Sequence, residues 1–288
     1  MTTPTRSRRP IEDSFRRLKE RTQEGLFLHS VELKIDRSWI GRRLLAAVLF
    51  TYQDLGRPGR HWSKIRDYLV HLNDENLSFQ LGYLQLEFGM VKESIATFQE
   101  LLDRALLRDA TVDPLLISNL IDALNGAGEY SDAIHVFENV LPKIALSGPK
   151  DTIHYNAGNS FYGEERFTEA ARCYRIALSI RTSNRCHILH NLGNCYSEMG
   201  DEASALEWYK HALDEATTDS ERGVEEYAIG RSSAELGRRG DALAYYRRAA
   251  DRGHTRAAQK IAQMSLRCRD VRTDAMHTAR RKPRLPGG

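Results

Sequence analysis

The chain has 288 residues, of which 41% are hydrophobic and 28% are charged, and its formal net charge at pH 7 is +3. Its four cysteines show no paired spacing, which argues against a disulfide-rich secreted scaffold and favours reduced thiols. The longest apolar run, Leu44–Phe50, is too short to span a bilayer, and the basic N-terminal stretch leads into no apolar signal core, so we expect a soluble cytoplasmic protein.

The N-terminal quarter carries the weakest pattern. Residues 1–37 are basic and are expected to be partly disordered. Residues 38–72 predict a degenerate first helix hairpin, in which an apolar helix ends at Gly56 and a turn follows at Arg57–Gly59. Leu49 would take the middle position of the first helix of this hairpin.

A clearer unit occupies Asn184–Thr218, which predicts a helix, a tight turn and a second helix. Apolar residues such as Leu189 recur at three- and four-residue spacing and so share one face of the first helix. Gly193 lies in the middle of that helix, where glycine costs roughly 1 kcal/mol against alanine, so we expect a neighbouring helix to approach it closely. Gly200 is a C-cap candidate and Asp201 an N-cap candidate for the second helix.

Between residues 75 and 252 this unit recurs in five copies. In each second helix a small or polar residue is followed by a ring four positions later and by an apolar residue three positions further. These stripes are Ser94/Phe98/Leu101, Ala133/Phe137/Val140, Ala170/Tyr174/Ala177, Ala205/Tyr209/Ala212 and Ala242/Tyr246/Ala249. The matching middle positions of the first helices are Gly82, Ile121, Gly158, Gly193 and Gly230, at intervals of 39, 37, 35 and 37 residues. This pattern, with a period slightly above ~34 residues, resembles the tetratricopeptide repeat (TPR) family over about two-thirds of the chain.

The resemblance implies an all-α fold, a right-handed superhelical solenoid of antiparallel helix hairpins spanning residues 38–253. Residues 254–272 then predict a capping helix, with Ala257, Ile261 and Met264 facing the last repeat and Lys260 facing water. The junction at 241–259 also looks similar to a Sel1-like repeat. The remaining residues, 273–288, are expected to form a basic disordered tail.

Charge is unevenly distributed along the chain. Residues 1–43 have a net charge of +5 and residues 252–288 of +8, whereas the body between them has −10. The basic ends could contact nucleic acid, although weakly, because no aromatic interleaving or base-reading motif accompanies the arginines. The alternative is that they are solvated tails on an acidic scaffold.

Motifs of enzymes are missing from the sequence: it has no Walker glycine loop, no GxSxG elbow and no HExxH. Cys186, His187 and His190, with Cys195 further along, form the one cluster that could suggest a metal. It lacks the paired spacing of a structural zinc site, so we expect no metal, no cofactor and no catalysis.

The family resemblance places the first helix of each repeat on a concave side. On that side the middle repeats carry aromatic, amide and basic side chains, and these are the predicted partner-binding residues: Tyr155, Asn156, Asn159, Tyr162, His187, His190, Asn191, Asn194, Tyr227 and Arg231. Asparagine offers both a donor and an acceptor and so matches a peptide backbone. Some of these residues could instead join adjacent repeats.

The sequence therefore predicts a non-enzymatic scaffold or adaptor that binds a peptide segment or partner protein in its concave groove, with no membrane association. An alternative is a regulatory protein whose basic ends contact nucleic acid while the solenoid binds a protein or peptide signal. A metal-dependent enzyme is a third and weaker alternative. A clamp for the C-terminal carboxylates of chaperones is not expected, because Tyr155, His190 and Tyr227 stand where such co-chaperones have lysines.

Overall fold

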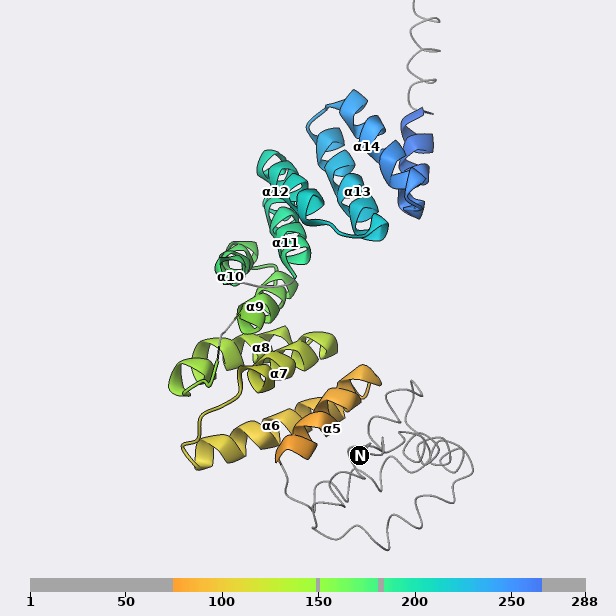
Figure 1. The fold of residues 1–288 in the computed structure, drawn as a ribbon. Coiled ribbons are helices and arrows are strands. Elements are labelled where there is room, and N and C mark those ends of the chain that lie inside the picture. The colour runs from red at the N-terminus through yellow and green to blue at the C-terminus, as the bar shows by residue number, and fades with distance from the viewer. Residues whose placement is uncertain (1–74, 149–150, 181–183, 266–288) are drawn as a thin grey trace, which may run out of the picture. The chain divides into compact units, whose positions relative to one another are not determined.

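The structure is a computed structural model that describes residues 75–148, 151–180 and 184–265 (Figure 1). The predicted N-terminal segment, the degenerate hairpin at 38–72, the end of the capping helix and the tail at 273–288 lie outside these residues. The chain divides into two compact units, residues 1–148 and 149–288, and each is described by itself.

The described part of the first unit contains two hairpins. Its elements are α5 (Glu75–Glu87), α6 (Val91–Leu107), α7 (Pro114–Ala127), α8 (Tyr130–His135), the π-helical turn η1 (Val136–Val140) and the 3-10 turn η2 (Leu141–Lys143). Helix α5 packs against α6, α6 against α7, and α7 against α8. An isolated bridge joins Val112 to Leu146, and the described residues form no strand beyond it.

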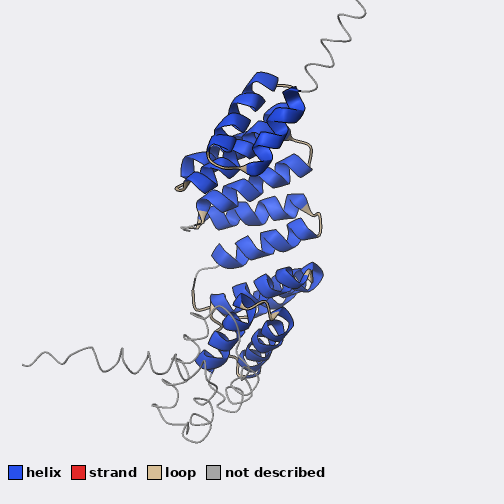
Figure 2. Cartoon of the chain, turned by 90° about the vertical axis from the view of Figure 1, so that its right-hand side faces the viewer, coloured by secondary structure: helices blue, strands red, loops and turns tan. Residues whose placement is uncertain are grey.

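The second unit contains three hairpins and one further helix. The hairpin helices are α9 (Asp151–Gly163), α10 (Phe167–Ser179), α11 (Arg185–Glu198), α12 (Glu202–Glu215), α13 (Asp219–Glu235) and α14 (Arg239–Asp251). Another helix follows at 255–265. Each second helix packs against the first helix of the next hairpin, so the unit is a stack of antiparallel hairpins, as Figure 2 shows. This is the repeat arrangement that the sequence predicts.

In four of the five described hairpins, the middle of the first helix is packed against a ring of the second helix. A Cβ atom built on Gly193 would lie 2.4 Å from Cε1 of Tyr209, and one built on Gly158 would lie 2.6 Å from Cε1 of Tyr174. Such distances are far below any van der Waals contact, so only glycine admits the buried ring. The same contact occurs between Gly82 and Phe98 and between Gly230 and Tyr246. The predicted close approach at the mid-helix glycines is confirmed.

The second repeat departs from the predicted pattern. Ile121 stands where the other repeats have glycine, and it is fully buried. Phe137, which takes the place of the buried ring of the other repeats, is only half-buried. The predicted stripe through Phe137 and Val140 is therefore wrong: Val136 and Leu141 are buried instead, and the helix widens into the π-helical turn η1 between them.

The predicted boundary between α11 and α12 is confirmed. Gly200, between α11 and α12, has a φ of 80°, a conformation that glycine adopts without steric cost. Asp201 caps α12, since its side chain accepts a hydrogen bond from the backbone N of Ser204. Asp113 likewise caps α7 by accepting from the backbone N of Leu115. These side chains satisfy N–H groups that a helix start leaves unpaired.

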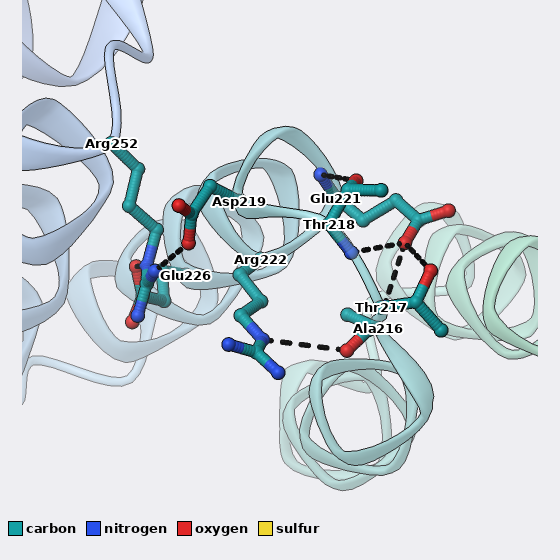
Figure 3. Close-up of polar contacts among 8 residues, drawn as sticks. All are labelled: Ala216, Thr217, Thr218, Asp219, Glu221, Arg222, Glu226 and Arg252. Atoms are coloured by element: carbon teal, nitrogen blue, oxygen red, sulfur yellow. Dashed lines mark hydrogen bonds and ion pairs between the residues drawn. The ribbon is translucent and has the colours of Figure 1, made fainter.

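A capping box fixes the connection into α13 (Figure 3). Thr218 Oγ1 accepts a hydrogen bond from the backbone N of Glu221 at 3.1 Å, and Glu221 Oε2 accepts from the backbone N of Thr217 and Thr218 at 2.8 and 2.9 Å. These backbone donors stabilise the carboxylate and lower the pKa of Glu221 to about 2. Arg222 Nε also donates to the carbonyl of Ala216.

Candidate partner-binding site

The ten predicted site residues all lie in the second unit, on first helices. Helix α9 carries Tyr155, Asn156, Asn159 and Tyr162, α11 carries His187, His190, Asn191 and Asn194, and α13 carries Tyr227 and Arg231. The side of the unit formed by α9, α11 and α13 is called the first-helix face below. His187 is exposed, Asn156 is buried, and the other eight are half-buried.

Asn159 lies at the centre of one cluster of hydrogen bonds. Its Oδ1 accepts from the hydroxyl of Tyr174 at 2.7 Å and from Nδ2 of Asn191 at 3.3 Å. The first bond joins α9 to α10 within a repeat, and the second joins α9 to α11 between repeats. Burial raises the pKa of Tyr174 far above its usual value, so this hydroxyl stays protonated and remains a donor.

Asn194 forms the equivalent hydrogen bond one repeat later. Its Oδ1 accepts from the hydroxyl of Tyr209 at 2.7 Å, and that hydroxyl accepts from Arg231 Nη2 at 2.8 Å. A guanidinium can only donate, so the one proton of the Tyr209 hydroxyl must point to Asn194. This fixes the amide of Asn194 with its oxygen toward Tyr209 and its nitrogen away from it.

His190 joins α11 to α13. Its Nδ1 lies 2.9 Å from Oε2 of Glu225, a carboxylate that is only 3% exposed, and its ring packs 5.4 Å from that of Tyr209. A buried carboxylate requires such a partner, because desolvation without one is costly. His190 therefore contributes to repeat docking.

The three predicted tyrosines also pack against neighbouring rings. Tyr155 lies 6.0 Å from Tyr174 between ring centroids, and Tyr227 lies 5.5 Å from Tyr246. Tyr227 is also stacked on His254 at 4.3 Å. These rings are anchored, and part of each surface remains accessible.

Tyr162 is held from two sides. Its ring meets Phe167 edge-on at 5.3 Å, and its hydroxyl donates to Glu198 Oε1 at 3.5 Å. Burial is the largest cause of its raised pKa, and the nearby Glu198 carboxylate adds to it.

Sequence reasoning found the asparagines but missed the groups that orient them. The tyrosine hydroxyls, Glu225 and His254 were not predicted to take part. A signal was present: both Tyr–Asn hydrogen bonds join residues separated by 15 positions, from Asn159 to Tyr174 and from Asn194 to Tyr209.

The cysteine and histidine cluster on α11 is spread over different surroundings. Cys186 and Cys195 are buried free thiols, and burial raises the pKa of Cys186 to about 11 and that of Cys195 to about 12. His187 is exposed and His190 pairs with Glu225. Within the described ranges, no group of three or more His, Cys, Asp or Glu side chains could hold a metal ion.

A cavity of about 470 Å³ adjoins the first-helix face between α13, the start of α14 and helix 255–265. Its lining includes the cations Arg231, Arg239 and Lys260, the carboxylate of Glu235, and the apolar groups of Tyr246 and Met264. Met264 and Ile261 pack on the last hairpin, around the fully buried Ala257, as predicted. Lys260 was predicted to face water; it is half-buried and lines this cavity instead.

None of the helices in the described part of the chain is long and apolar enough to cross a membrane.

Comparison with known proteins supports the fold. Residues 149–214 match the sequence profile of the Tetratricopeptide repeat family. No curated protein sequence matches the chain. The match ends before the junction at 241–259, so the Sel1-like character of that junction remains a prediction.

Solved structures share the architecture at low sequence identity. MamA is 17% identical with a TM-score of 0.51 and covers 62% of this chain and 97% of its own. A putative kinesin light chain of Podosopora anserina with TPR-like repeats is 14% identical with a TM-score of 0.51, covering 68% and 98%. YrrB, described as a TPR protein with an unusual peptide-binding site, is 17% identical with a TM-score of 0.50, covering 68% and 92%. The profile match, the stacked hairpins and the repeated glycine–ring contacts show that residues 149–214 match the tetratricopeptide repeat family and that the described part of the chain has the tetratricopeptide-repeat fold.

Proposed function

We propose that the first-helix face of the second unit binds an extended peptide segment of a partner protein. Tetratricopeptide repeats generally serve as non-enzymatic scaffolds for protein interactions, and their stacking creates extended binding surfaces. The chain would then be an adaptor, and the cytoplasmic location expected from its composition belongs to the same proposal.

The observation that carries the proposal is the orientation of two amides. Asn159 and Asn194 each receive a tyrosine hydroxyl on Oδ1, which leaves their Nδ2 groups as donors. Neither Nδ2 has an acceptor in the described part of the chain. Both side chains are half-buried, so two donors of known direction are available on one face.

Such amides suit an extended peptide. Backbone carbonyls recur along it irrespective of sequence, and an asparagine N–H can bond to any of them. Because the tyrosines already hold the amides in place, binding costs little further side-chain entropy. The exposed parts of Tyr155, Tyr162 and Tyr227 add apolar contact area with few rotatable bonds.

The same amides also join repeats, so their two roles must be separated by the choice of variant. Alanine would remove the acceptor of a buried tyrosine hydroxyl and weaken the fold. Aspartate is nearly isosteric and keeps that acceptor, but replaces the two N–H donors with a second acceptor. Asn159→Asp combined with Asn194→Asp therefore tests binding while leaving the tyrosine bonds in place.

The test is selection from a phage-displayed library of random 12-residue peptides. Wild-type protein is expected to enrich peptides that bind the second unit, and the double aspartate variant to lose them while melting within a few degrees of wild type. Asn139→Asp, the same change at an exposed position of the first unit, is the control and should enrich the same peptides. Unchanged selection by the double variant, or no enrichment by wild type, would contradict the proposal.

The nucleic-acid alternative rests on the +5 and +8 net charges of the chain ends. Most of those residues lie outside the described part, so this alternative remains a hypothesis from the sequence. Salt-dependent duplex binding tests it, as set out in the Discussion.

A further inference from the structure

We infer that the cavity between α13, α14 and helix 255–265 binds a carboxylate side chain of the partner, so that the site selects acidic peptides. The inference rests on the proposed function and adds the chemistry of the segment that is bound. It concerns an acidic side chain within the peptide and requires no free C-terminus.

The cavity has an excess of positive charge. Arg231, Arg239 and Lys260 line it, against the single carboxylate of Glu235. None of these three cations forms an ion pair within the described ranges. Arg239 donates instead to the backbone carbonyl of Met264, which is a neutral group.

Arg231 is the best placed of the three cations. Its Nη2 donates to the hydroxyl of Tyr209, which orients the guanidinium. Its Nε is buried and has no hydrogen-bond partner. A buried donor without an acceptor is costly, and a carboxylate is the acceptor that a guanidinium binds best.

The carboxylates of α13 other than Glu235 have partners away from this cavity. On α13 itself, Glu225 pairs with His190 and Glu221 caps the helix. Glu226 and Asp219 both pair with Arg252, as Figure 3 shows.

A second cavity at the base of α13 gives a useful contrast. It has about 510 Å³ and is lined by two arginines and three carboxylates, namely Arg248, Arg252, Asp219, Glu226 and Asp251. Its side chains carry one more negative than positive charge. The excess of cations is therefore a property of the cavity around Arg231.

The cavity also continues the first-helix face. Arg231 follows Gly230 just as Asn159 follows Gly158 and Asn194 follows Gly193, so these three side chains take equivalent positions in successive repeats. A peptide whose backbone is held by the two amides would bring a side chain toward Arg231 at the α13 end. A glutamate or aspartate there would meet three cations.

The test uses the same random 12-residue library, displayed with no free peptide C-terminus. Peptides enriched on wild type are expected to carry an excess of Asp and Glu at one position. For a synthetic enriched peptide, changing that Glu to Gln should weaken binding about tenfold, the loss of one charge-assisted contact. Lys260→Gln should weaken the acidic preference and Lys260→Glu, which balances the charges of the lining, should abolish it. Lys260 has no hydrogen bond in the described structure whose loss would weaken folding.

Lys210→Glu is the matched control, since Lys210 lies on α12, does not line the cavity and pairs with Glu207. It should keep the acidic preference. If wild type enriches peptides without acidic residues, and the Asn159→Asp, Asn194→Asp double variant no longer enriches them, the cavity inference is overturned and the proposed function stands. An acidic preference that persists in both Lys260 variants would also overturn it. No enrichment at all would overturn both.

Discussion

Replacing Gly193 with alanine tests the packing on which the repeat depends. The new Cβ would lie 2.4 Å from Cε1 and 2.6 Å from Cδ1 of Tyr209, a ring that is fully buried, so the ring must move. Overpacking of this kind costs about 1–3 kcal/mol. The shift would also strain the hydrogen bonds of the Tyr209 hydroxyl to Asn194 and Arg231, which costs about 1–3 kcal/mol more. The higher helix propensity of alanine offsets roughly 1 kcal/mol of this loss.

The net result is a destabilisation of roughly 1–5 kcal/mol, or a fall in melting temperature of roughly 3–15 °C followed by circular dichroism. Gly126→Ala is the control, because a Cβ there would meet only a Val91 methyl at 4.0 Å. That variant should melt at or above the wild-type temperature. If Gly193→Ala is as stable as wild type, or if both glycines respond alike, the close-packing explanation of the mid-helix glycines is refuted.

Three further outcomes are expected. Tyr209→Phe should lower the free energy of unfolding of the second unit by about 1–2 kcal/mol in urea, because Asn194 and Arg231 lose their shared hydrogen-bond partner. Tyr246→Phe should change it little, because the Tyr246 hydroxyl has no such hydrogen bond in the described structure. Equal losses in the two variants would refute the role of the Tyr209 hydroxyl. The folded pKa of Glu221 is depressed to about 2, so its stabilising effect is present above its unfolded pKa near 4.5 and is lost as the pH falls from there toward 2. Glu221→Gln should therefore flatten the fall of melting temperature in that window, and an unaltered pH profile would contradict the capping assignment. Wild-type protein should bind duplex DNA weakly and with steep salt dependence, and deleting residues 1–10 and 273–288 should remove the binding. Tight binding that prefers one DNA sequence would instead favour the nucleic-acid alternative.

Much of the fold could be predicted because the repeat is specified by contacts close in sequence. A glycine and a ring 16 positions later recur at Gly158 and Tyr174 and at Gly193 and Tyr209, and each pair defines one hairpin. The second repeat could not be predicted in the same way. Ile121 stands where the other repeats have glycine, and the way the second helix adjusts at Phe137 depends on packing that the repeat pattern does not contain.

The candidate site was predictable only in part. The sequence indicates which residues lie on the first helices, because helical periodicity fixes the face. It does not indicate that Tyr209 lies between Asn194 and Arg231, since that depends on how two repeats dock. The charge of the cavity could not be predicted either. The sequence pattern places Lys260 on the solvent-facing side of an amphipathic helix, whereas in the structure Lys260 lines the cavity together with residues of α13.

The central claim is that the oriented amides of the first-helix face bind a peptide backbone. The most direct measurement is a calorimetric titration of a peptide selected on wild type into wild-type protein and into the Asn159→Asp, Asn194→Asp double variant. We expect the dissociation constant of the double variant to be at least about tenfold higher, since two hydrogen bonds are lost, with a melting temperature within a few degrees of wild type. Equal affinity in a folded double variant would contradict the account and assign these amides to repeat docking alone.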